Sequence, residues 1–174
     1  TNAHVLDKAV ESDNAVLTVV INPGTAATQM RRAVRLAQDE GHDLALLKID
    51  GSPLPALTLA DGGLVREGAA VGFTGFPIGG ALGFSPVTHR GMISAVTSIA
   101  PPVPSARALN EKVIRSVKSG RYDVYQLDAT AYPGNSGSPV FDAESGVVIG
   151  IINMVFIKST REAALSQPSG ISYA

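Results

Sequence analysis

The stretch YPGNSGSPVFD, residues 132–142, crowds glycines, prolines and small polar residues around Ser136 and then turns apolar. Turn-forming residues ahead of an apolar run are typical of a loop that leads into a β-strand. The alternative, a serine on a strand-to-helix turn of the Gly-x-Ser-x-Gly type, needs a glycine where Ser138 stands and a helix after it. Pro139, followed by Val-Phe and the turn formers DAESG, predicts a short strand instead. The sequence therefore places this serine on a loop that leads into a strand.

The rest of the chain repeats this alternation of short apolar runs and tight turns. Turns such as NPG (22–24) and DGSP (50–53) separate runs rich in Val, Ile, Leu and Thr. The clearest runs are AVLTVVI (15–21), DLALLKI (43–49), AAVGFTGF (69–76) and VVIGIINMVF (147–156). This rhythm predicts an all-β barrel or sandwich. The exception is residues 105–120, whose apolar positions recur at helical spacing and predict one short helix.

Composition excludes several classes of function. The 174 residues are 45% hydrophobic, which is enough for a buried core, and carry a net charge of -1, which gives no basic field to attract nucleic acid. The chain has no cysteine, so it has no disulfide, thiolate nucleophile or sulfur-ligated metal. No apolar run approaches the roughly 18 residues that span a bilayer. We therefore predict no cofactor, no metal, no nucleic-acid partner and no transmembrane segment in this chain.

A serine hydroxyl becomes a strong nucleophile only when a base takes its proton and donors wait for the oxyanion. Gly134 lets the backbone turn so that its own N–H and that of Ser136 point into one concavity. The base should be one of the three histidines, His4, His42 and His89. His42 follows a glycine and two acidic residues and is expected to be exposed, whereas His89 lies in SPVTHRG beside Arg90, where a catalytic role is not favoured. His4 stands in TNAHVL, which matches a known pattern.

TNAHVL, GHDLALLKID and YPGNSGSPVFD resemble, in this order, the three active-site segments of the chymotrypsin-like serine peptidases. The likeness is to the bacterial HtrA/Deg type, with a GNSGSP motif like that of the glutamyl endopeptidases. VREGAAVGFTGFPIG (65–79), HRGMISAV, GVVIGIIN and GISYA are similar to strands of the family's second barrel. The resemblance implies an all-β, trypsin-like fold of two six-stranded antiparallel β-barrels. Residues 1–60 would form the N-terminal barrel and residues 61–174 the C-terminal one, which would hold the short helix.

The resemblance also implies a role for each matched residue. His4 would be the general base, Asp43 the carboxylate that orients it, and Ser136 the nucleophile, with Gly134 and Ser136 donating the oxyanion-hole N–H groups. The order His, Asp, Ser separates this family from subtilisin-type enzymes and α/β-hydrolases, which use other orders. The implied activity is that of a serine endopeptidase acting on protein or peptide substrates. Two alternatives remain open: a catalytically silent barrel pair that binds peptides or acts as a chaperone, and an esterase or acyl transferase.

By the same resemblance, Thr130, Asn153, Met154 and Val155 would line the pocket for the substrate side chain that precedes the cleaved bond. No acidic residue stands at the base of this pocket, so a preference for Lys or Arg is not expected. Glutamyl endopeptidases carry a histidine where this chain has Ile152, which argues against a preference for Glu. Val155 should narrow the pocket, so we expect small or medium aliphatic side chains there.

The sequence departs from the family at its ends. The family places two strands of the first barrel before the histidine, whereas this chain begins three residues before His4. A first barrel without those strands would leave unpaired edges and apolar surface, so we expect this polypeptide alone to be poorly active or to associate, and a homo-oligomer stays open. The chain ends at GISYA, where HtrA relatives continue into a helix and often a PDZ domain. The resemblance implies a periplasmic or secreted location.

Overall fold

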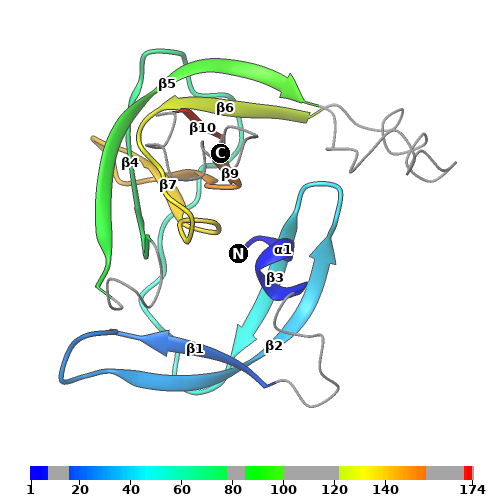
Figure 1. The fold of residues 1–174 in the computed structure, drawn as a ribbon, viewed down its shortest axis with the longest axis vertical. Helices are drawn as coiled ribbons and strands as arrows, with labels where there is room; N and C mark the ends of the chain where they lie inside the picture. Colours follow the sequence, from blue (N-terminus) through cyan, green and yellow to red (C-terminus); the bar gives the residue numbers. More distant parts are fainter. Residues whose placement is uncertain (8–15, 78–84, 100–121, 156–170, 174) are drawn as a thin grey trace, which may run out of the picture.

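The computed structural model describes residues 1–7, 16–77, 85–99, 122–155 and 171–173. Within these ranges the chain forms ten β-strands and one short helix (Figure 1). The helix is α1 (Ala3–Asp7), and the strands are β1 (Leu17–Ile21), β2 (Gln29–Asp39), β3 (Leu44–Ile49), β4 (Ala70–Gly75), β5 (Val87–Ile99), β6 (Tyr122–Asp128), β7 (Pro139–Asp142), β8 (Val148–Ile151), β9 (Met154–Val155) and β10 (Ile171–Tyr173). The prediction of an all-β, trypsin-like fold is confirmed by this architecture and by the structural comparison given below.

The first sheet contains β1, β2 and β3 in that order, and both pairings are antiparallel. Ala33, in the middle of β2, is opposite Leu17 of β1 and Ile49 of β3, and it is buried. A bulge between Arg35 and Ala37 shifts the register of β2 against β3. The two strands then run on to a tight turn, and this hairpin points toward the second sheet (Figure 1).

The second sheet has seven strands in the order β8-β7-β4-β5-β6-β10-β9, all paired antiparallel. It curls around a core to which β4, β5, β6 and β7 each contribute large apolar side chains. The fully buried apolar members are Val71, Phe73, Ile93, Leu127, Val140 and Ile152. Burying each such side chain contributes about 1.5–3 kcal/mol, so this core anchors the second sheet.

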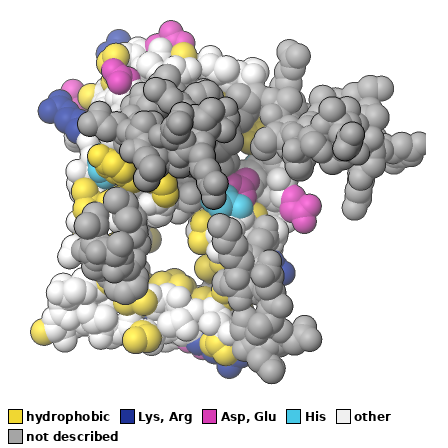
Figure 2. All heavy atoms as spheres, viewed as in Figure 1, with side chains coloured by type: hydrophobic (Ala, Val, Ile, Leu, Met, Phe, Trp, Pro, Cys, Tyr) yellow, Lys and Arg dark blue, Asp and Glu magenta, His cyan; other side chains and the backbone are white. Residues whose placement is uncertain are grey.

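The first sheet keeps apolar side chains at the surface. Met30 is 77% exposed and Leu46 is 59% exposed. Met30 is opposite Val20, and Leu46 is opposite Ala37, so the apolar residues face each other across the strands. Figure 2 shows hydrophobic side chains at the surface of the lower part of the molecule, where β1, β2 and β3 lie. The expectation of exposed apolar surface on the first barrel agrees with this arrangement.

The strands differ from the expected ones in three respects. The run 147–156 holds two strands, β8 and β9, because the chain between them turns toward the serine loop: the N–H of Ile152 donates to the carbonyl of Ser138 at 2.8 Å. The second sheet therefore has seven strands instead of six, and the first has three among the residues described. Neither β2 nor α1 was predicted. The helix expected over 105–120 lies outside the described residues.

In the ranges that the structure describes, no helix has the length and apolar character that crossing a membrane requires.

Candidate active site

His4 and Asp43 form the most direct side-chain pair of the site. His4 lies on α1, and Asp43 is the last residue of the turn before β3. The Nδ1 atom of His4 is 2.6 Å from Oδ2 of Asp43, and the backbone N–H of His4 donates to Oδ1 at 2.9 Å. A carboxylate that carries no proton only accepts hydrogen bonds, so with a neutral ring this pairing puts the hydrogen on Nδ1 and makes Nε2 an acceptor. This is the tautomer that a general base needs.

The segment before His4 is attached to β3 by backbone bonds, which fixes where α1 begins. The N–H of Ala45 donates to the carbonyl of Thr1 at 2.8 Å, and the N–H of Ala3 donates to the carbonyl of Asp43 at 3.0 Å. The side-chain amide of Asn2 donates to the same Asp43 carbonyl at 3.1 Å. Asn2 is completely buried. The sequence did not reveal this role of Asn2, because its burial and its hydrogen bond to Asp43 are visible only in the structure.

The serine loop, residues 134–138, has two backbone donors without an acceptor. The N–H groups of Asn135, Gly137 and Ser138 all donate to backbone carbonyls. In contrast, among the described residues no acceptor bonds the N–H of Gly134 or Ser136. Gly134 has a φ of 101°, a conformation that glycine adopts without steric cost. The loop thus leaves unpaired the two N–H groups that the sequence nominated for an oxyanion hole.

The serine loop also touches the segment that carries His4. Gly137 has a φ of 84°, and a Cβ built there would lie 2.6 Å from Oγ1 of Thr1 and 3.4 Å from the backbone N of Asn2. The residue after Ser136 is therefore in close contact with residues two and three positions before His4. Within the described part of the chain no hydrogen bond joins His4 to Ser136. Such bonds in unliganded enzymes are often long and tighten only when substrate binds.

The other two histidines occupy different environments. His42 forms a second histidine–carboxylate pair, with Nδ1 2.7 Å from Oδ2 of Asp39, and its side chain is 52% exposed as expected. No described contact links it to the serine loop. His89 lies in β5 and stacks on Phe73, with ring centroids 4.8 Å apart. Its Nε2 is buried and has no hydrogen-bond partner among the described residues. Of the three, only His4 combines a carboxylate partner with contact between its segment and the serine loop.

The burial of His89 predicts how the free energy of unfolding depends on pH. Burial lowers the pKa of His89 below its ordinary value of about 6.5. The unfolded chain therefore binds this proton more readily than the folded chain does. The free energy of unfolding should fall as the pH drops through about 6.5 toward the pKa of His89 in the folded state. The slope should be at most about 1.4 kcal/mol per pH unit. Urea unfolding between pH 8 and pH 5, at intervals of about half a unit, measures this. In His89→Phe, which keeps a ring against Phe73, the slope should be smaller; an equal slope would assign the effect to other groups.

The four residues predicted to line a substrate pocket are only partly described. Thr130 is exposed and Asn153 is half-buried, and both lie on segments that flank the serine loop. Met154 and Val155 form β9, and their side chains lie outside the described set. Ile152 is completely buried in the core of the second sheet. The pocket assignment therefore stays a prediction.

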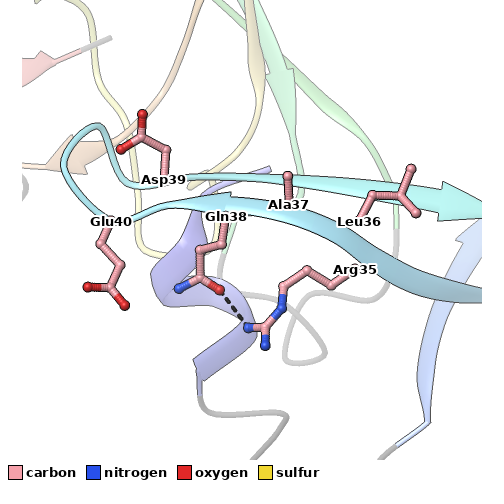
Figure 3. Close-up of a pocket in the computed structure, with 6 residues that line it drawn as sticks. All are labelled: Arg35, Leu36, Ala37, Gln38, Asp39 and Glu40. Carbon is pink, nitrogen blue, oxygen red and sulfur yellow. Dashed lines mark hydrogen bonds between the residues drawn. The ribbon is translucent and has the colours of Figure 1, made fainter.

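Two hollows lie near the β2–β3 hairpin. The larger, of about 920 Å³, follows residues 35–40, at the end of β2 and the start of the turn (Figure 3), and none of the three predicted catalytic residues lines it. The smaller, of about 370 Å³, is bordered by Thr1, Leu44 and Ile151 and is mainly apolar. The residues that line the larger hollow include no serine. In the described ranges no three His, Asp or Glu side chains gather as a metal site would require.

Comparison with known proteins identifies the family and fold that this chain resembles. A family model described as "Trypsin-like peptidase domain" matches residues 1–151. A "Probable periplasmic serine endoprotease DegP-like" of Halomonas elongata is 33% identical over 95% of this chain, and one of Rhizobium meliloti is 35% identical over 91%. The solved structure of "HtrA-type protease AlgW with decapeptide" matches 100% of this chain and 43% of its own, with 28% identity and a TM-score of 0.65. The chain spans only 29% and 26% of the two curated relatives.

Proposed function

We propose that this chain, which belongs to the trypsin-like peptidase family, carries the active site of a serine endopeptidase. The observation that supports this most strongly is the 2.6 Å contact between Nδ1 of His4 and Oδ2 of Asp43, together with a serine loop whose Gly134 and Ser136 N–H groups have no acceptor among the described residues. A histidine oriented by a carboxylate, a nearby hydroxyl and waiting backbone donors are the parts that acyl transfer requires. The names of the relatives, which describe serine endoproteases, point to the same reaction class.

In the proposed reaction, Nε2 of His4 takes the proton of Ser136 as its Oγ attacks the carbonyl carbon of the peptide. The negative oxygen of the tetrahedral intermediate accepts hydrogen bonds from the N–H groups of Gly134 and Ser136. His4 then donates its proton to the departing amine, and an acyl ester remains on Ser136. Nε2 of His4 next takes a proton from a water molecule whose oxygen attacks that ester, and His4 returns the proton to Oγ of Ser136 as the acid leaves. The task of Asp43 is to hold the ring and stabilise the imidazolium that forms.

A fluorophosphonate probe tests the proposal directly. The Oγ of Ser136 should attack the phosphorus and expel fluoride, which leaves a covalent adduct that mass spectrometry can locate. Labelling should be absent in Ser136→Ala and strongly reduced in His4→Ala. Ser138→Ala is the matched control, because it removes a neighbouring hydroxyl and should keep labelling at Ser136.

Absence of labelling at Ser136 in the unmodified protein would support the silent peptide-binding alternative instead. Labelling accompanied by turnover of esters but not of peptides would indicate an esterase or acyl transferase.

The proposed substrates are proteins or peptides with a small or medium aliphatic residue before the cleaved bond. Thr130, Asn153, Met154 and Val155 would line that pocket, and none of them is acidic or cationic. A methylene group discriminates by only about 1–3 kcal/mol in such a pocket, so cleavage of a peptide library should favour Val, Ala, Ile or Leu by about 10-fold to 200-fold over the poorest residues. Dominant cleavage after Arg, Lys or Glu would contradict this assignment.

We propose a periplasmic or extracellular location, since the names of the two relatives describe periplasmic proteins. We also propose that residues 1–60 and 61–174 act as two barrels with the site between them, and that the exposed apolar face of the first sheet favours association of copies. Sedimentation at several concentrations would measure that association.

A further inference from the structure

Asp43 is held in an unfavourable backbone conformation at the end of a turn. Its φ is 55°, in the left-handed region that residues other than glycine enter at a cost of about 1 kcal/mol or more. Its carbonyl and carboxylate accept four hydrogen bonds, all from the segment Asn2 to His4. These bonds hold Asp43 from one side only. The turn that ends at Asp43 also has contacts of its own.

Asp39 closes this turn. Its Oδ1 accepts the backbone N–H of Gly41 at 2.9 Å and that of His42 at 3.2 Å, while Oδ2 lies 2.7 Å from Nδ1 of His42. The bonds with the side chain and backbone of His42 lower the pKa of Asp39, so this carboxylate is ionised at neutral pH. The residue directly before Asp43 is thereby fixed through both its backbone and its ring.

Tyr122 connects the turn to the second sheet. Its ring centroid is 4.7 Å from that of His42, with the planes at 54°. Figure 1 shows the β2–β3 turn beneath the start of β6, where Tyr122 is the first residue. Burial, together with the negative charges of Asp43 and Asp39, raises the pKa of Tyr122, so its hydroxyl keeps its proton. The sheet that carries the serine loop thus also contacts the turn that carries Asp43.

We propose that Asp39, His42 and Tyr122, which we call the turn cluster, are positioning residues that hold the Asp43 carboxylate against His4. This inference rests on the proposed function and adds three residues to it. The cluster joins the turn that ends at Asp43 to the second sheet, which also carries the serine loop. None of the three touches the reacting atoms, so they act through Asp43.

Removing a ring or a bond of the turn cluster should lower kcat and leave KM unchanged. A misplacement of about 1 Å in a catalytic group costs up to about 100-fold in rate, so Tyr122→Ala and Asp39→Ala should each lower kcat about 10-fold to 100-fold. Conservative variants should restore the rate. Tyr122→Phe keeps the ring contact, and Asp39→Asn keeps an oxygen that can accept the two backbone N–H groups.

Arg35→Ala is the matched control on the same hairpin. The Nη1 atom of Arg35 donates to Oε1 of Gln38 at 2.5 Å, and Figure 3 shows this pair on the opposite side of β2 from Asp39. The variant removes a hydrogen bond of comparable length without touching the turn cluster. Its kcat should equal that of the unmodified protein. Urea unfolding of all variants checks that each remains folded.

A spectroscopic signature tests the same inference without turnover. The Nδ1 proton of His4, held at 2.6 Å from a carboxylate oxygen, should give a low-field proton resonance in protein labelled with ¹⁵N-histidine. The variant His4→Asn, which lacks this proton, assigns the resonance. It should be lost or displaced in Tyr122→Ala and Asp39→Ala, and retained in Tyr122→Phe, Asp39→Asn and Arg35→Ala.

The possible failures are distinguishable. Absence of fluorophosphonate labelling in the unmodified protein would overturn the proposed function, and the resonance would still decide whether the turn cluster positions Asp43. Normal labelling with an unchanged kcat and an unchanged resonance in folded Tyr122→Ala would overturn the inference alone. An equal loss of kcat in Tyr122→Phe would also overturn it, because that variant keeps the ring contact.

Discussion

Replacing Asp43 with asparagine is expected to lower kcat for peptide hydrolysis by about 10⁴, the loss known for serine–histidine–aspartate triads. The Oδ2 atom of Asp43 accepts the Nδ1 hydrogen of His4 at 2.6 Å. An amide nitrogen at that position would donate instead, so the imidazole would have to carry its hydrogen on Nε2. His4 could then no longer take the proton of Ser136. Steady-state kinetics on a peptide substrate would measure the change, and KM should be unaffected.

Asp50→Asn is the control for this experiment. Asp50 is an exposed carboxylate just beyond the other end of β3, and its backbone N–H donates to the carbonyl of Arg32 in either variant. The substitution therefore makes the same chemical change without reaching the site, and activity should be retained. If Asp43→Asn kept its kcat within about tenfold of the unmodified protein, the proposed role of Asp43 would be wrong.

Replacing Gly75 with alanine is expected to displace the serine loop. Gly75 is the last residue of β4, and a Cβ there would lie 2.5 Å from Oδ1 of Asn135 and still closer to Oγ of Ser138. Asn135 is completely buried and Ser138 is 7% exposed, so neither side chain can move into solvent. Overpacking of this kind costs about 1–3 kcal/mol of unfolding free energy. Because Ser136 lies between the two displaced residues, its labelling rate should fall at least about tenfold.

A second substitution makes the origin of this effect testable. Ser138→Gly removes the atom nearest to the added methyl group, so the double variant should recover part of the stability and part of the labelling rate. Residues in contact normally show such coupling, whereas independent sites add. Urea unfolding and labelling kinetics of the four variants form the complete cycle. Full additivity, with no recovery, would show that the clash with Ser138 is not the cause.

The local sequence predicted the strands whose apolar runs are clearly bounded by turn-forming residues. β1, β3, β4 and β7 lie where these patterns indicated. β2 could not be predicted in this way, since QMRRAVRLAQD (29–39) is rich in residues that also favour helices. It becomes a strand because β1 and β3 pair with it on both sides, and β-propensity depends strongly on such neighbours.

The local sequence also predicted the serine loop, for a related reason. Its turn formers act locally, so GNSGSP predicted a loop followed by a strand, and the structure has a loop followed by β7. The local sequence did not predict the division of residues 147–156 into β8 and β9. That break depends on hydrogen bonds between Ile152 and residues of the serine loop. Those residues lie outside the run, so no pattern within the run itself indicates the break.

The choice among the histidines shows where sequence reasoning ends. A family resemblance nominated His4, while neighbouring acidic residues predicted only that His42 would be exposed. Both turn out to have a carboxylate partner at nearly the same distance, 2.6 Å and 2.7 Å. What separates them is the contact between Gly137 and Thr1, which brings the serine loop to the segment of His4.

The sequence by itself determined a serine among turn formers, an all-β chain without cysteine, and a net charge of -1 with no basic excess. Tertiary structure alone decided which carboxylate faces which imidazole, and that Tyr122 supports the turn before Asp43. The physical reason is the range of the interactions. Turn formation and strand alternation depend on neighbouring residues, whereas the pairing of His4 with Asp43, 39 positions apart, exists only after the segment before His4 has bonded to β3.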